Sequence, residues 1–244
     1  MKSLIKYDLR KNLRIAIFVS IANIMAALLF NIISSFSYDM TAIDHSEIFE
    51  DSLGIFSLSL FAYLYLVIFA YFIYLAKDFS SNLYHNEKYL LFTHPSNSYK
   101  YLLTKIITAT ITTAPVYVSY FFSVMLLAND TPITAPKLIE LTNDFFKALP
   151  YFYSLSLSAL MLAYFSIIVT KKLNENLKFE YFWIIPFVLS FSLLLIINGF
   201  FVNDLSFNNY LFIPLGLKSI IIFFLISITF FLINAFILEK HFDF

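Results

Sequence analysis

The residues of this chain that are best able to do chemistry are few, and their spacing does not suit a reaction centre. His85 and His94 lie nine residues apart. No acidic or thiol partner stands at the spacing of a metal site, so we interpret both as solvated loop histidines. The chain has no cysteine, which excludes a thiol nucleophile and a disulfide framework. It also lacks the Gly-x-x-x-x-Gly-Lys-Ser/Thr phosphate loop. We therefore expect a chain that is not an enzyme and binds no metal or cofactor of its own.

The elements that carry these residues are dominated by apolar runs. Six stretches of at least 20 residues contain no charged residue and no histidine, and about 20 apolar residues are enough to cross a bilayer as a helix. Hydrophobic residues make up 60% of the chain and charged residues 13%, unlike a soluble domain. We predict an all-α polytopic membrane protein, with one transmembrane domain over residues 1–244. Its six helices should cover about 15–37, 53–76, 101–128, 149–170, 181–200 and 218–238.

The uncharged runs also exclude some classes of membrane protein. Their strongest polar side chains are the amides of Asn23, Asn31, Asn198 and Asn234. Ion-coupled carriers and intramembrane hydrolases usually need an ionisable group or a metal ligand at membrane depth, and amides carry protons poorly. Both classes are therefore disfavoured.

The distribution of charge predicts the orientation. Basic residues precede the first run and occupy the second and fourth loops, whereas the first loop contains acids and no basic residue. The basic residues are Lys2, Lys6, Arg10, Lys11, Arg14, Lys77, Lys88, Lys100, Lys105, Lys171, Lys172 and Lys178. The positive-inside rule then places both termini in the cytoplasm of a protein that crosses the plasma membrane several times.

Residues 1–14 have two neighbouring rows at helical spacing. The apolar row is Met1, Ile5, Leu9 and Leu13, and the cationic row is Lys2, Lys6, Arg10 and Arg14. Such a segment can lie as an amphipathic elbow helix among anionic lipid headgroups before the chain turns into the first span. Alternatively, these cations are only a topology signal.

Small residues and prolines suggest how the spans pack. Ala22 with Ala26, and Ser154 with Ser158, share helix faces that allow close approach. Pro115 and Pro186 should each bend their helix, because proline removes a backbone donor and crowds the carbonyl four residues earlier.

The second loop, residues 77–100, mixes apolar and polar residues as neither a span nor a flexible linker does. Tyr89 to Phe92 predicts a short amphipathic helix, which Pro95 ends, and a new helix should begin near Ser96 or Ser98. An exposed apolar helix of this kind either docks a partner or lies flat on lipid headgroups.

The segment from Tyr89 to Lys105 resembles the loop after the second span in permease subunits of type-2 ATP-binding-cassette exporters. It reads Tyr-Leu-Leu-Phe-Thr-x-Pro, then small polar residues, then Lys-Tyr-Leu-Leu-x-Lys. Those permeases also have six spans, cytoplasmic termini and a basic elbow helix. The chain departs from the pattern by lacking a glycine near Asn86 and an aliphatic residue at His94. The resemblance implies a permease homodimer or heterodimer seated on a cytoplasmic ATPase, which binds and uses ATP and Mg.

The same resemblance assigns candidate site residues. ATPase docking would involve Glu87, Lys88, Tyr89, Leu90, Leu91, Phe92, Thr93 and Pro95. The first and fifth spans would face the dimer axis, so that Asn23, Ala26 and Pro186 line a substrate path, although ordinary helix packing also explains them.

The predicted cargo is hydrophobic or amphipathic, because no span carries a charged recognition site. The composition resembles permeases of low-GC Gram-positive bacteria that export bacteriocins or cytolytic peptides, such as phenol-soluble modulins. Four acids of the first loop, Asp44, Glu47, Glu50 and Asp51, either follow from the positive-inside rule or attract a cationic peptide at the outer mouth. Export of a drug, lipid or glycan precursor, and a scaffold or regulator without transport, are the alternatives. No nucleic-acid partner is expected.

Overall fold

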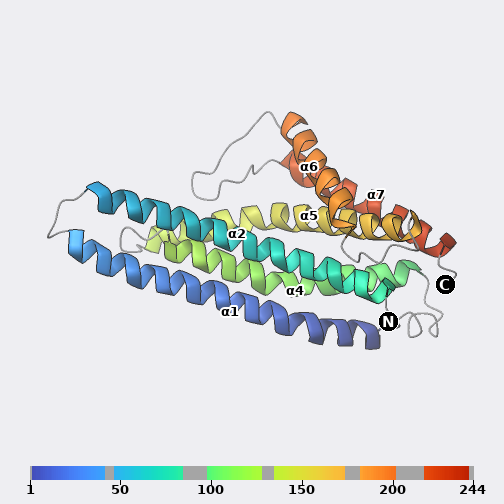
Figure 1. Cartoon of the computed structure of the whole chain (residues 1–244), viewed down its shortest axis with the longest axis horizontal. Coiled ribbons are helices and arrows are strands. Elements are labelled where there is room, and N and C mark those ends of the chain that lie inside the picture. The colour runs from blue at the N-terminus through green and yellow to red at the C-terminus, as the bar shows by residue number, and fades with distance from the viewer. Residues whose placement is uncertain are drawn as a thin grey trace. The chain divides into compact units, whose positions relative to one another are not determined.

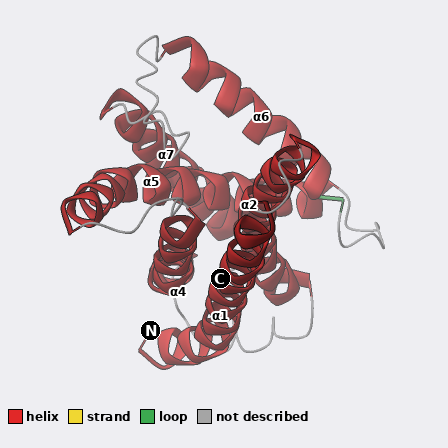
Figure 2. Cartoon of the chain, turned by 90° about the vertical axis from the view of Figure 1, so that its left-hand side faces the viewer, coloured by secondary structure: helices red, strands yellow, loops and turns green. Residues whose placement is uncertain are grey.

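The computed structural model describes residues 2–41, 47–84, 98–127, 135–173, 182–201 and 217–241. These residues form six helices (Figure 1). They are α1 (Lys2–Thr41), α2 (Glu47–Tyr84), α4 (Ser98–Leu127), α5 (Ala135–Leu173), α6 (Ile184–Phe201) and α7 (Leu217–His241). In the part of the chain that the structure describes there is no strand (Figure 2), which agrees with the predicted all-α class.

Five of these helices are long and apolar enough to cross a membrane. The apolar segments are Ile5–Ile33, Ala62–Ser81, Ser98–Leu126, Phe145–Lys172 and Leu217–Lys240. The remaining helix, α6, contributes a shorter apolar segment, Ile184–Ile196. The chain is therefore a helical protein with several spans able to cross a bilayer.

The distribution of side chains on α1 is the reverse of that in a water-soluble helix. Its buried face contains polar and small residues: Asp8, Asn12, Ala16, Ser20, Asn23 and Ala27. Its exposed face contains large apolar residues: Ile17, Phe18, Ile21, Met25, Leu28, Leu29, Ile32 and Ile33. In lipid no hydrophobic force drives large side chains inward, so small and polar residues take the helix contacts. This arrangement is what an apolar solvent around the helix requires.

Helix α7 shows the reversal in part. Ser219, Ser227 and Asn234 are buried together with Phe223 and Leu238, whereas Phe224, Leu225 and several neighbouring apolar residues are exposed. The buried hydroxyl of Ser227 is satisfied within its own helix, since Ser227 Oγ donates to the carbonyl of Phe223 at 2.7 Å. Because a hydroxyl can bond to the carbonyl four residues earlier, a serine needs no partner from another helix.

The chain divides into two compact units. The first contains residues 1–8, 72–110 and 146–244, and the second contains residues 9–71 and 111–145. In the second unit, Asn23 Nδ2 donates to Ser119 Oγ at 3.4 Å and Asn31 Nδ2 donates to the carbonyl of Leu126 at 2.8 Å. The two pairs are 96 and 95 residues apart, so α1 and α4 run in the same direction.

The first unit pairs α5 with α7. Asn234 Nδ2 donates to the carbonyl of Met161 at 3.0 Å, and the rings of Tyr151 and Phe223 meet edge to face at 5.8 Å. Tyr151 precedes Met161 on α5, and their partners Phe223 and Asn234 follow one another in the same order on α7. Helices α5 and α7 therefore also run parallel. Pairs of parallel helices separated by one intervening helix are expected where successive helices alternate in direction.

The structure differs from the sequence prediction at several helix ends. Helix α1 continues without interruption through Arg14, so the expected elbow helix is not confirmed. Helices α2 and α5 begin at Glu47 and Ala135, well before their apolar runs. Backbone hydrogen bonds along a helix need no apolar side chains, so composition alone underestimates helix length.

The prolines also need a correction. Pro186 lies in the first turn of α6, which begins at Ile184. There a missing N–H leaves no hydrogen bond unmade, so the predicted bend at this position was wrong. Pro115 does lie inside α4, and Pro150 lies inside α5. The predicted helix start near Ser98 is confirmed, since α4 begins at that residue.

Candidate functional site

Three charged side chains meet inside the first unit. Buried charges are costly in a helical membrane protein and are therefore rare there. Lys105 Nζ lies 2.8 Å from Asp8 Oδ2 and 3.0 Å from Asp78 Oδ2. The side chains of Lys105, Asp8 and Asp78 are 3%, 7% and 3% exposed. We call these three residues the ionic triad. It joins the second turn of α1, the last turns of α2 and the second turn of α4.

Burial makes the ionic triad energetically sensitive. Moving each charge out of water costs several kcal/mol, about the size of the attraction that it gains, so such a cluster adds little net stability. Removing Lys105 is different, because it leaves two buried carboxylates without a cation, at a cost of about 3–5 kcal/mol. Asp78 and Lys105 make further polar or electrostatic contacts as well. The ionic triad therefore depends most on the charge of Lys105, which pairs with both carboxylates.

Aromatic rings form the wall of the ionic triad. Phe79 stacks on Tyr164 with ring centroids 4.0 Å apart and on Tyr101 with centroids 6.0 Å apart. Lys105 Nζ lies 5.9 Å from the centre of the Tyr101 ring, within reach of a cation–π attraction. All three rings are buried. They exclude water from the ammonium group and bring α5 into contact with α2.

Local bonding fixes the part of α4 that carries Lys105. Thr104 Oγ1 donates to the carbonyl of Lys100 at 2.8 Å, and Thr108 Oγ1 donates to the carbonyls of Thr104 and Lys105. These hydroxyl bonds satisfy buried oxygens without a partner from another helix. The ionic triad can hold α1, α2 and α4 together, and a change in the charge of one member would alter this contact.

Among the described residues, no three or more His, Cys, Asp or Glu side chains lie together in a way that could hold a metal ion.

The residues predicted for ATPase docking lie outside the described part of the chain. All eight, from Glu87 to Pro95, fall in residues 85–97, as do His85 and His94. Of the four outer acids, Asp44 is also outside it. Glu47, Glu50 and Asp51 lie in the first two turns of α2, but their side chains are not among those described. Both assignments stay predictions.

The residues predicted to line a substrate path fall in different units. Asn23 is fully buried in the second unit and bonds to Ser119, while Ala26 is half-buried on the same helix. Pro186 belongs to the first unit. The contact made by Asn23 is one of helix packing, which was the alternative interpretation of these residues. A role in a substrate path is still a prediction.

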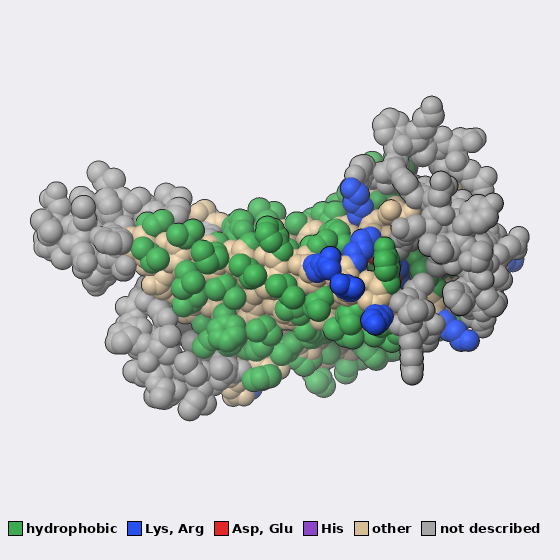
Figure 3. All heavy atoms as spheres, turned by 90° about the horizontal axis from the view of Figure 1, so that it is seen from below, with side chains coloured by type: hydrophobic (Ala, Val, Ile, Leu, Met, Phe, Trp, Pro, Cys, Tyr) green, Lys and Arg blue, Asp and Glu red, His purple; other side chains and the backbone are tan. Residues whose placement is uncertain are grey.

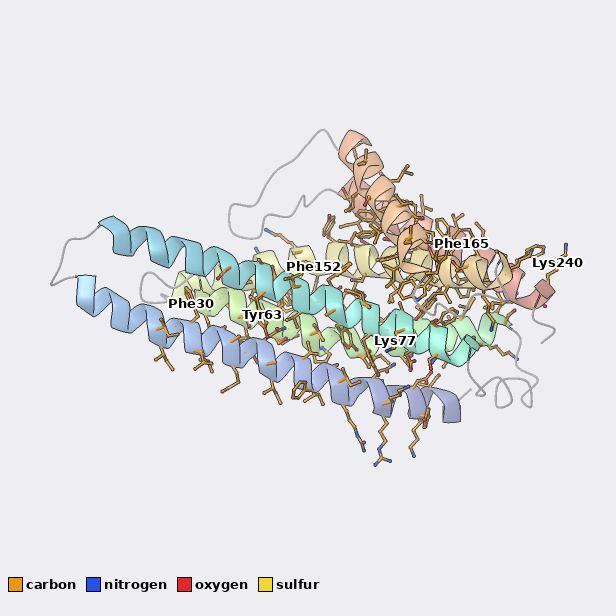
Figure 4. All side chains as sticks on the ribbon, viewed as in Figure 1. Phe30, Tyr63, Lys77, Phe152, Phe165 and Lys240 are labelled. Atoms are coloured by element: carbon orange, nitrogen blue, oxygen red, sulfur yellow. The ribbon has the colours of Figure 1, made fainter. Side chains whose placement is uncertain are left out.

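Sequence reasoning missed the ionic triad. It noted Lys77 and Lys105 only as topology signals and gave Asp8 no role; Figure 4 labels Lys77, the neighbour of Asp78. The sequence did contain one signal. Asp8 is the first acidic residue of the chain and lies in a basic segment, and the next acidic residue is Asp39. An isolated acid on the helix face opposite a cationic row suggests a buried partner.

A comparison of the chain with known protein families, with curated proteins and with solved structures finds no match.

Proposed function

We propose that this chain is the membrane-spanning permease subunit of an ATP-driven exporter of hydrophobic or amphipathic cargo. In this proposal six helices cross the plasma membrane, both termini are cytoplasmic, and a separate ATPase docks on residues 87–95. Two permease copies enclose the path of the cargo. Antimicrobial or cytolytic peptides are the cargo that best suits spans without a charged recognition site.

The observation that carries the proposal is the position of the ionic triad relative to the predicted docking segment. Asp78 lies six residues before the end of α2 at Tyr84, and Lys105 lies seven residues after the start of α4 at Ser98. Both helices that lead into residues 85–97 are thus fastened to each other and to α1 within two turns. A force applied to the segment by an ATPase would move the three helix ends as one body.

The apolar surface of the helices supports the kind of cargo. Large apolar side chains are exposed along α1, α6 and α7, including Phe18, Leu189 and Phe224. A hydrophobic cargo that partitions into lipid can reach such surfaces without crossing water. A hydrophilic cargo would need a polar or charged pathway, and the charges of the ionic triad inside the spans are paired with one another.

The decisive experiment is reconstitution of the chain with candidate ATPases. The chain is purified with each soluble ATPase whose gene lies beside its own, and placed in vesicles. ATP hydrolysis is then measured with and without an amphipathic peptide. We expect one ATPase to copurify in a stable ratio and peptide to stimulate its hydrolysis. An ATPase variant without its phosphate-loop lysine is the control and should bind without hydrolysis.

The same experiment separates transport from the alternatives. Stimulation by drugs, lipids or glycan precursors in place of peptides would change the cargo but keep the exporter. If no ATPase associates with the chain and no cargo changes hydrolysis, the proposal fails and a scaffold or regulator is the better interpretation.

A further inference from the structure

We propose that the exposed cationic face at the N-terminal end of α1 binds the headgroups of anionic phospholipids. Lys6, Arg10 and Arg14 stand four residues apart on a continuous helix, and each is exposed. Tyr7 lies beside them and is 65% exposed. We call Lys6, Arg10 and Arg14 the cationic row. The inference concerns lipid recognition and does not depend on the proposed transport function.

The opposite face of the same turns is held by buried residues. Asp8 pairs with Lys105, and Asn12 is 2% exposed. Residues four apart share a helix face, so fixing Asp8 and Asn12 inward directs the cationic row outward. No ion pair between described residues involves Lys6, Arg10 or Arg14. Figure 4 shows nitrogen-tipped side chains along one side of this part of α1.

The change from cationic to apolar side chains along α1 indicates that lipid, rather than a soluble protein, binds this face. Continuing at the same spacing, the row passes directly from Arg14 to Phe18, which is 73% exposed, with exposed Ile21 and Met25 beyond it. In Figure 3 the lysine and arginine side chains gather next to hydrophobic ones. A surface that changes from cationic to large apolar within one turn matches the boundary between lipid headgroups and acyl chains. A soluble acidic partner would account for the cations but not for the exposed apolar side chains that follow.

The expected strength is modest and depends on salt. A cation near an anionic membrane surface changes the local lipid preference by about fivefold. This attraction decays over the Debye length, which is about 10 Å at 0.1 M salt and about 3 Å at 1 M. The sequence predicted an elbow helix that lies flat among lipid headgroups. In the proposal made from the structure, Asp8 holds the N-terminal end of α1 against Lys105 of α4, and only the opposite face of the helix contacts lipid.

The test measures which lipids surround residue 7. Because the chain has no cysteine, Tyr7→Cys introduces a single site for a fluorescent donor. The labelled chain is placed in phosphatidylcholine vesicles that contain a small fraction of phosphatidylglycerol carrying an acceptor on its headgroup. Energy transfer is compared with that to the same acceptor on phosphatidylcholine. We expect about a fivefold enrichment of phosphatidylglycerol at 0.1 M salt and a clear decrease at 1 M.

Matched variants locate the effect. Lys6→Gln with Arg10→Gln and Arg14→Gln should reduce the enrichment to about one, whereas Arg10→Lys with Arg14→Lys should keep it, because charge is retained. Lys172→Gln, Lys218→Gln and Lys240→Gln remove exposed cations elsewhere and should change nothing near residue 7. All of these changes are made in the Tyr7→Cys chain. A membrane-impermeant thiol reagent, applied before the donor is attached, confirms that each variant keeps its orientation.

Two results would overturn the proposal. One is the absence of enrichment around the chain that keeps its cationic row, which would leave an acidic protein surface as the partner of that row. The other is an enrichment that survives in the correctly oriented triple glutamine variant, which would place the lipid preference on other residues.

Discussion

Asp8 and Lys105 are 97 residues apart in the sequence, yet Asp8 Oδ2 lies 2.8 Å from Lys105 Nζ. This ion pair fixes the register in which α1 meets α4 inside the first unit. In the second unit the same two helices pair at separations of 96 and 95 residues. A nearly constant separation is the signature of two helices that run parallel. Charged side chains connect α1 to α4 in the first unit, and uncharged amides connect them in the second.

Loss of the ammonium group from the ionic triad should destabilise the protein strongly. Lys105→Met leaves two buried carboxylates facing each other without compensation, and we expect a loss of about 3–5 kcal/mol in the free energy of unfolding. The measurement is unfolding of the purified chain in detergent. Lys100→Met is the matched control, because Lys100 is exposed on the same helix, and it should change stability by less than about 0.5 kcal/mol.

Neutralising all three charges together should recover part of that loss. In Lys105→Met combined with Asp8→Asn and Asp78→Asn, no buried charge of the ionic triad is left uncompensated. A triple variant no more stable than Lys105→Met alone would show that shape, rather than charge balance, accounts for the effect.

The ring of Phe79 should matter more than that of an exposed phenylalanine on the same helix. Phe79→Ala removes a fully buried ring and its stacking on Tyr164, so we expect a loss of about 3–5 kcal/mol. Phe69 is 43% exposed on α2, and Phe69→Ala should cost much less. Thermal unfolding of both variants in the same detergent checks the difference, and equal shifts would contradict the packing described here.

The docking segment can be tested without affecting the spans. If Leu91 and Phe92 fill a groove on the ATPase, changing both to alanine should release it, because apolar anchors in desolvated pockets dominate interface energy. Copurification of the ATPase is the measurement, and the amount of chain in the membrane fraction shows that insertion is unchanged. Phe182→Ala removes an exposed aromatic residue from another loop and should leave binding intact. Full retention of the ATPase by the double variant would exclude this segment as the main contact.

The outer acids should act on charged cargo alone if they attract it. Changing Asp44, Glu47, Glu50 and Asp51 to their amides should reduce export of cationic peptides more than export of neutral ones, and high salt should narrow the difference. Transport into inverted vesicles measures both cargoes. Glu239→Gln, an exposed acid at the end of α7, is the control. An equal effect on both cargoes, or none, would leave these acids as topology signals.

The sequence by itself determined that the chain is helical and apolar enough to cross a membrane several times. Uncharged runs such as the one from Ser219 to Leu238 have one stable form in lipid, because a helix satisfies its own backbone hydrogen bonds. The start of α4 at Ser98 was also predictable, since Pro95 disfavours helix at the residue before it and a new helix was expected just beyond. These features are local, and local chemistry decides them.

Only the tertiary structure decided which charges meet and which faces turn inward. The sequence around Asp8 hints at a buried partner but does not identify it, because Lys105 lies 97 residues away. Nor did composition separate the buried Asn23 from the exposed Phe18, since both belong to one uncharged run. In an apolar solvent, hydrophobicity no longer marks the inside of a helix. The orientation of each helix therefore depends on the few polar side chains that find partners on another one.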